Sequence, residues 1–378
     1  MKAPLLFSKK LIICVISILG FSALSAQCDW EAVGPDDDQF FIEEGGTLYK
    51  PAIASDNNGV QYVAYTDGGS GDKISVKRYV NEHWTYVGPR GFSPAKADYV
   101  KIATDNLNRV YVAYQDYANG NRLTVQFYNG FSWNVIGTPG MGNDTTIRFD
   151  LCVDKSTSRP LVFFTDSVDI STVMEFNGST WNVLGATNFA QSNMYEIEIS
   201  SNNGTPYLSY ISYGPSTLNV LKFNGTAWVS AGAVPPSFVN AGWNSAVTFD
   251  INDVPHIAFE DITASSHASV MYLNAGVWNY LGTPGIAAYS TWYHNLAFDQ
   301  SNNAFLSCTK IGGAAAQIFK YNGTSWNLIS THLTPTNAYI TSQYAYYRDM
   351  SIDPITNDLY MLYTESTATP LMGWKDYG

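Results

Sequence analysis

The chain has 378 residues, with 20 Lys or Arg against 32 Asp or Glu, so its formal net charge at pH 7 is −12. An acidic chain lacks the basic footprint that nucleic acid or an anionic membrane surface requires, so both are excluded as partners. Hydrophobic residues make up 46% of the sequence and charged residues only 14%, which provides a folded core and excludes a disordered chain.

The first 26 residues have the pattern of an export signal. Lys9 and Lys10 precede an apolar run over 11–24, which ends in the small residues Ser25 and Ala26. This order is typical of a secretory signal peptide cleaved near Ala26. The run is short for a bilayer span, and no later segment is long and apolar enough to cross. We therefore expect residues 1–26 to be removed and the rest to be secreted, either to the periplasm or outside the cell. The alternative is a signal anchor that stays in place.

Residues 29–34 form the first expected strand of the mature chain, and an acidic loop with aromatic residues follows it. Asp36, Asp37 and Asp38 are side chains of the kind that bind Ca²⁺. A solvated acidic loop explains the run better, so we expect no cofactor and keep Ca²⁺ at these three aspartates as the alternative.

A repeat of about 49 residues begins at residue 49 and continues to the end of the chain. One mark of the repeat is a Trp that opens a short β-like run: Trp30, Trp84, Trp133, Trp181, Trp228, Trp278 and Trp326. A second mark is an Asp that ends an apolar strand and opens a turn: Asp56, Asp105, Asp154, Asp250, Asp299 and Asp353. The fourth unit has Ser201 and Asn202 at this point instead.

Each unit is predicted to contain four antiparallel strands. In the second unit they are 101–105, 110–114, 123–128 and 133–136, which are rich in Val, Ile, Tyr and Phe. Asn-Gly, as at Asn129, separates the third strand from the fourth in several units and is a strong hairpin signal. Four-stranded units repeated at this period are typical of β-propeller blades.

The fold class predicted is therefore all-β, a seven-bladed β-propeller of four-stranded antiparallel blades. The single domain spans 27–378, with blades at about 49–88, 98–137, 147–185, 194–232, 243–282, 292–330 and 346–378. The last unit stops before a fourth strand, so the N-terminal strand 29–34 is expected to complete the last blade.

The turn before the fourth strand, as in Asn177-Gly-Ser-Thr-Trp181 and Asn322-Gly-Thr-Ser-Trp326, resembles a degenerate Asp-box. That motif is found in exported propellers with sialidase-like repeats, where it is a structural turn remote from the active site. The resemblance implies the fold and does not imply sialidase activity. Seven-bladed lectins with repeated Trp motifs are a second, looser resemblance.

Antiparallel order places the loops between blades on one face, around the mouth of the central channel, and that face is the candidate site. The two longest of these loops flank the last blade and combine aromatic with polar residues, a mixture that suits sugar binding. A loop that merely covers the closure seam is an equally good explanation. The residues predicted to bind ligand are Phe40, Phe41, Tyr99, Lys101, His294, Tyr339, Tyr344, Tyr346, Tyr347 and Arg348.

Polar residues also recur at the channel-mouth end of the innermost strands. Carboxylates beside Arg and Tyr could perform acid–base chemistry on a glycosidic bond, although a wet, polar channel would have the same residues. The candidates for catalysis are Asp150, Glu196, Glu198 and Asp349, with Arg148 and Tyr293 as stabilising groups. No residues have the spacing of a metal site.

The favoured function is non-catalytic binding of a glycan or another extracellular ligand at the channel mouth. The first alternative is a polysaccharide-active enzyme, a glycoside hydrolase or lyase that uses the channel-mouth carboxylates. The second alternative is a protein-interaction or surface scaffold without a small-ligand site.

Overall fold

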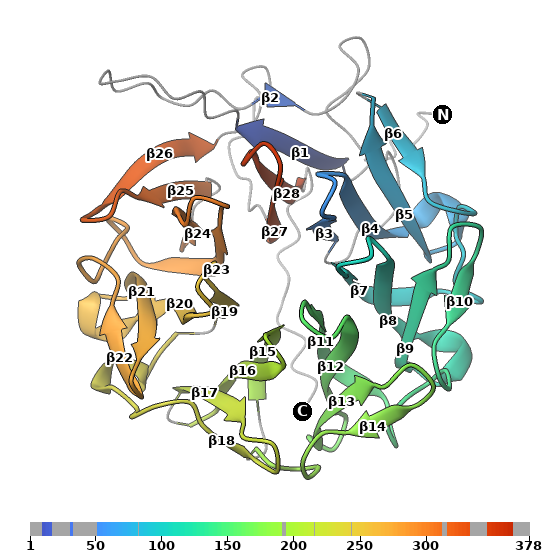
Figure 1. Ribbon diagram of the computed structural model, residues 1–378, viewed down its shortest axis with the longest axis horizontal. Coiled ribbons are helices and arrows are strands. Elements are labelled where there is room, and N and C mark those ends of the chain that lie inside the picture. The colour runs from blue at the N-terminus through green and yellow to red at the C-terminus, as the bar shows by residue number, and fades with distance from the viewer. Residues whose placement is uncertain are drawn as a thin grey trace, which may run out of the picture.

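The computed structural model describes residues 10–16, 31–32, 51–81, 83–190, 194–214, 216–242, 244–311, 316–332 and 346–365. Its strands form four-stranded antiparallel sheets arranged around a common axis (Figure 1). The prediction of an all-β propeller of four-stranded antiparallel blades is confirmed. No helix in the described part of the chain is long and apolar enough to cross a membrane.

Three blades follow one another in the first half of the chain, and we number them in chain order. Blade 1 contains β3 (Ala52–Ser55), β4 (Gln61–Asp67), β5 (Lys73–Val80) and β6 (His83–Tyr86). Blade 2 contains β7 (Ala97–Thr104), β8 (Val110–Asp116), β9 (Arg122–Tyr128) and β10 (Trp133–Val135). Blade 3 contains β11 (Thr146–Asp154), β12 (Arg159–Asp166), β13 (Ser171–Phe176) and β14 (Trp181–Val183).

Three more blades follow in the second half. Blade 4 contains β15 (Met194–Asn202), β16 (Thr205–Ser212), β17 (Thr217–Phe223) and β18 (Trp228–Ser230). Blade 5 contains β19 (Ser245–Phe249), β20 (Pro255–Asp261), β21 (His267–Asn274) and β22 (Val277–Tyr280). Blade 6 contains β23 (Thr291–Phe298), β24 (Ala304–Lys310), β25 (Ala316–Tyr321) and β26 (Trp326–His332). Short 3₁₀ turns lie at Gly68–Ser70, Tyr117–Asn119, Pro236–Phe238 and Ile262–Ala264.

The prediction of a seven-bladed propeller is wrong. Within the described residues, six blades are built from four consecutive strands each, and the unit after them adds only β27 (Tyr346–Ile352) and β28 (Leu359–Glu365). These two strands belong to a different kind of sheet, the closing sheet, which has the order β2-β1-β28-β27. The expected third strand of the unit, at 371–374, lies outside the described residues.

The closing sheet draws its outer half from the start of the chain. The strand beside β28 is β1 (Lys10–Ile16), which pairs along its whole length from Lys10 opposite Glu365 to Ile16 opposite Leu359. Of the predicted strand 29–34, the structure describes β2 (Glu31–Ala32), which pairs with β1 and not with the C-terminal unit. The apolar run assigned to a signal peptide is rich in Ile and Val, which favour strands, and it provides a strand here.

The closing sheet lies between blade 6 and blade 1, because its inner strand β27 contacts both β23 and β3 (Figure 1). The apolar core is a set of clusters between neighbouring blades. In the cluster between blades 2 and 3, for example, Tyr111, Ala113 and Leu123 of blade 2 pack with Phe149 and Phe164 of blade 3. Each blade is therefore stabilised mainly by its neighbours, as expected of sheets that are apolar on both faces.

Tryptophan and glycine join neighbouring blades at the rim. The indole Nε1–H of Trp181 in blade 3 donates to the carbonyl oxygen of Ile136 in blade 2 at 2.8 Å. The next residue, Gly137, has φ +72°, and a Cβ there would lie 2.4 Å from Cδ1 of Trp181. The same bond recurs from Trp133 to Val87, from Trp228 to Leu184 and from Trp326 to Leu281. This contact explains the Trp and Gly periodicity of the sequence.

The aspartates of the repeat close the turn between the first and second strands of a blade, as predicted. One carboxylate oxygen of Asp105 accepts bonds from the backbone N–H groups of Leu107 and Arg109, both at 2.9 Å. Its other oxygen accepts a bond from the hydroxyl of Tyr111 at 3.1 Å. Asp56, Asp250 and Asp299 bind their own turns in the same way. Such buried side-chain bonds fix the turn conformation.

Candidate ligand-binding site

The innermost strands are irregular near their first residues, where the sequence placed the channel mouth. The pairing register shifts around Tyr99 in β7, Glu196 in β15 and Tyr293 in β23. These three residues have φ values of +45°, +32° and +54°. Non-glycine residues rarely adopt positive φ, and such strain concentrates at functional sites. The bulges put a Tyr, a Glu and a Tyr at equivalent positions of blades 2, 4 and 6.

Near the bulged ends of the innermost strands, charged side chains converge on the axis of the ring. We call this group the axial cluster: Lys101, Asp150, Glu198 and Asp349. The Lys101 ammonium lies 2.9 Å from Oδ1 of Asp150 in the next blade. The side chain of Lys101 is 37% exposed and that of Asp150 is 11% exposed, so water reaches the cluster. The structure thus brings three of the four predicted catalytic carboxylates and one predicted ligand-binding lysine together.

Each carboxylate of the axial cluster also accepts a backbone hydrogen bond from the neighbouring sheet. Asp150 accepts the N–H of Ile199 at 2.8 Å, and Glu198 accepts the N–H of Val247 at 3.2 Å. Asp349 of the closing sheet accepts the N–H of Ile53 in blade 1 at 3.0 Å. One oxygen of each group is therefore used between blades. The other oxygen of Asp150 binds Lys101, and the other oxygen of Asp349 accepts the N–H of Met350 at 2.9 Å.

The pKa values of Lys101, Glu198 and Asp349 in the axial cluster are all raised. Burial alone would lower the pKa of Lys101, but the carboxylates of Asp150, Glu198 and Asp349 outweigh burial, and the pKa is raised. Burial, together with the negative charge of Asp150, raises the pKa of Glu198 well above its usual range. Burial likewise raises the pKa of Asp349, although Lys101 opposes it. The cluster therefore combines a firmly charged cation with carboxyl groups that bind protons readily.

The other three predicted catalytic residues have the following surroundings. Glu196 is exposed on its bulge and adds negative charge beside Glu198. The guanidinium of Arg148 lies 5.4 Å from the ring centre of Tyr195, as a cation–π pair. The backbone N–H of Tyr293 donates to Oδ1 of Asn244 at 3.3 Å. Their roles in catalysis remain predictions.

His294 lies inside the protein and not at the channel mouth. It is 3% exposed, its Nε2 lies 3.0 Å from the hydroxyl of Thr291, and its Nδ1 lies 3.3 Å from the carbonyl oxygen of Asn244. Burial lowers the pKa of His294 to about 4. A neutral imidazole with both nitrogens in contact with protein supports the fold, and we do not include it in the site.

Several residues predicted to bind ligand lie outside the described residues, namely Phe40, Phe41, Tyr339 and Tyr344, and so do Asp36, Asp37 and Asp38. Tyr346, Tyr347 and Arg348 lie on β27, where the structure describes the strand and not the side chains. Within the described ranges, no group of three or more His, Cys, Asp or Glu side chains could hold a metal ion.

A second set of buried aspartates, at the ends of the second strands, was missed by the sequence reasoning: Asp67, Asp116, Asp166 and Asp261. In blade 2, the Asp116 carboxylate accepts bonds from the backbone of Ala118 and from the side chains of Asn119 and Thr124. In blade 1, Arg90 binds both carboxylate oxygens of Asp67. An aromatic-x-Asp that recurs at the ends of these four second strands was the available signal. These aspartates hold the loops on the axial-cluster face in place.

No family model and no curated protein matches the sequence. The lectin SapL1, solved in complex with α-methyl fucoside, is similar in structure with a TM-score of 0.50 at 11% identity, over 76% of this chain and 97% of the lectin. AofleA from Arthrobotrys oligospora has a TM-score of 0.50 at 10% identity, over 79% of this chain and 92% of its own. The Hadza microbial sialidase Hz136 has a TM-score of 0.44 at 12% identity, over 75% of this chain and 65% of the sialidase. At these identities the likeness concerns the fold, and no family is assigned.

Proposed function

We propose that the protein is an exported propeller that binds a glycan, without turnover, at the face where the axial cluster opens. The observation that carries the proposal is the convergence of Lys101, Asp150, Glu198 and Asp349 from different sheets onto one water-accessible point. An ammonium donates to sugar hydroxyls, and carboxylates accept from them. A fold shared with a lectin makes glycans the first ligand class to test.

The rim of the site supports the same ligand class. Tyr99 and Tyr293 are held at positive φ on the bulges of β7 and β23, Tyr99 lies two residues before Lys101, and its side chain is exposed. An aromatic ring packs against the apolar face of a pyranose, while the polar groups next to it bind the hydroxyls. The negative groups outnumber Lys101 and Arg148, so the site favours neutral or amino sugars over acidic ones.

The test is a glycan array, followed by titration calorimetry on the best ligand. We expect Lys101→Met to weaken binding at least tenfold, because it removes the central donor and leaves the three carboxylates without a cation. Lys222→Met, on β17 away from the axis, is the matched control and should bind like the wild type. Melting curves of both variants check that they fold. Equal affinity of the two variants would remove the axial cluster as the site.

Polysaccharide hydrolysis or lysis is the second candidate, and one observation favours it. Glu198 has a raised pKa and lies beside Asp150, whose oxygen is held by Lys101. Carboxyl groups whose environments separate their pKa values are typical of acid–base pairs. A reducing-sugar assay on the array hits distinguishes the two functions: release of sugar supports the enzyme, and binding without release supports the lectin-like function. If the protein binds no glycan on the array and releases no reducing sugar, the results support an interaction scaffold.

Export is also part of the proposal, and it rests on the N-terminal pattern around Lys9, Lys10 and Ala26. Cleavage after Ala26 would remove β1 from the closing sheet. N-terminal sequencing of protein recovered outside the cytoplasm tests this directly: a first residue of Gln27 supports cleavage, and a retained Lys10 contradicts it.

A further inference from the structure

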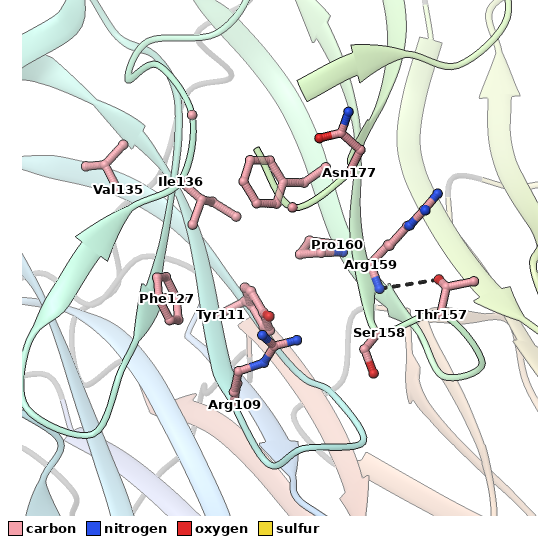
Figure 2. Close-up of a pocket in the computed structure, with 13 residues that line it drawn as sticks. Arg109, Tyr111, Phe127, Val135, Ile136, Thr157, Ser158, Arg159, Pro160 and Asn177 are labelled. Atoms are coloured by element: carbon pink, nitrogen blue, oxygen red, sulfur yellow. Dashed lines mark hydrogen bonds between the residues drawn. The ribbon is translucent and has the colours of Figure 1, made fainter. Parts of the chain in front are cut away.

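A pocket of about 410 Å³ lies in the groove between blades 2 and 3 (Figure 2). It is formed by the turns between the first and second strands, which carry Arg109 and Arg159, and by the hairpin turn at Asn177. These turns lie at the opposite end of the strands from the bulges, so the pocket and the axial cluster are on opposite faces. Its volume falls within the range of small-ligand sites, roughly 300–1,000 Å³.

The wall of the pocket is apolar and aromatic. Phe127 and Phe176 come from the third strands of the two blades. Val135 is the last residue of β10, Ile136 follows it, and Pro160 comes from blade 3 (Figure 2). Phe176 is held by Trp181, with ring centres 5.4 Å apart. Rings fixed by packing offer a flat surface without an ordering penalty, which suits one face of a sugar ring.

Two arginine–carboxylate pairs provide the polar part of the pocket. Arg109 binds Asp105 through Nε at 2.5 Å, and Arg159 binds Glu175 through Nη1 at 3.0 Å. The arginine side chains are 40% and 47% exposed, and their remaining nitrogens can donate to a ligand. Because each guanidinium already has a carboxylate, the pairs carry no surplus positive charge. The pocket therefore offers fixed donors and acceptors to neutral hydroxyls, and not an anion site.

The arginine pair distinguishes this groove from the others. Only the neighbouring blades 2 and 3 have an arginine where the second strand starts: Arg109 directly precedes β8, and Arg159 is the first residue of β12. The corresponding residues of the other blades are Val60, Thr205, Val254 and Asn303. The fold requires no arginine at this point, so the pair calls for a local explanation, and a ligand that bridges the two blades provides one.

We propose that this groove is a second, independent binding site that takes a neutral saccharide. One face of the sugar packs on Phe176 and the wall at Val135, and its hydroxyls bind the free guanidinium nitrogens of Arg109 and Arg159. The site does not depend on the axial cluster.

The test uses the whole chain and an array of neutral methyl glycosides, with glucuronate and sialic acid as acidic probes. Val135→Trp fills the pocket, and Arg159→Ala removes a donor that is half-exposed. Val183→Trp is the matched control, because Val183 has the same position on β14 as Val135 on β10, is 45% exposed and does not line the pocket. We expect both pocket variants to weaken binding at the groove at least tenfold while binding at the axial cluster persists, and Val183→Trp to bind like the wild type.

Lys101→Met separates this site from the proposed function. If Lys101→Met alone loses binding, the groove is not a site and the axial cluster remains. If Val135→Trp and Arg159→Ala alone lose it, the groove is the site and the axial cluster is not. Absence of binding to every neutral saccharide, or binding of acidic probes only, overturns the inference about the groove.

Discussion

Single side chains connect one blade to the next at both the axis and the rim. At the axis, Asp150 and Glu198 each accept a backbone N–H from the following blade. At the rim, Trp181 donates to Ile136 of the preceding blade. Leaving a buried partner without its bond costs about 1–3 kcal/mol. The axial carboxylates therefore have a structural role beside any role in binding, which is why Lys101, and not a carboxylate, is the informative residue to change.

His294 makes stability depend on pH. Its folded pKa is about 4, below the usual 6.5, because burial disfavours the charged form. A lowered folded pKa contributes stability that is present above pH 6.5 and is lost as the pH falls toward 4. The full difference corresponds to about 3 kcal/mol. In urea unfolding at pH 7, 5 and 4, we expect His294→Gln to lose less stability than the wild type over this range.

The exposed His83 on β6 provides the control for that measurement. His83→Gln should retain the wild-type pH dependence, since the carboxylates that also titrate in this range are the same in all three proteins. If His294→Gln lost stability as steeply as the wild type, another buried group would carry the effect.

At the scale of the strand, the bulge at Tyr99 in β7 places a strained backbone conformation close to the candidate site. Glycine adopts φ +45° without the steric penalty of a side chain, so Tyr99→Gly should regain up to about 1 kcal/mol compared with Tyr99→Ala. Both substitutions remove the ring, so both should weaken glycan binding to a similar extent. Thermal unfolding and calorimetry of the two variants test this. A glycine variant less stable than the alanine variant would show that the bulge is not strained.

The sequence predicted the strands and the Asp turns because each leaves a local pattern that recurs in most units. It marked the positions of the Trp residues but did not predict their contacts with the preceding blade. The bulges were not predicted, since a one-residue shift at Tyr99 or Glu196 leaves the alternation of the rest of the strand intact. The axial cluster was predicted in part, because the repeat aligned Lys101 with Asp150. The groove was not predicted, since Arg109 and Arg159 become neighbours only when two blades pack together.

At the scale of the whole molecule, the predicted number of blades was wrong because of the sheet in which the two ends of the chain meet. The apolar run of β1 fits a signal peptide and a buried strand equally well, because both need consecutive Leu, Ile and Val. The composition of the run is compatible with both, so the sequence alone did not distinguish a signal peptide from a buried strand. In the structure β1 covers β28, and without it the backbone groups on that edge of β28 would lack their partners.

Truncation tests how much the closing sheet contributes. A chain that begins at Gln27 lacks β1, so we expect it to melt several degrees lower than the full chain and to associate as its concentration rises, since an open strand edge pairs with other chains. A chain that begins at Lys9 keeps β1 and is the matched control; it should melt like the full chain. Calorimetry and size-exclusion chromatography of both truncated chains decide the point. Equal melting of the two would mean that the propeller closes without β1, and that a signal peptide can be removed from this chain without opening its last sheet.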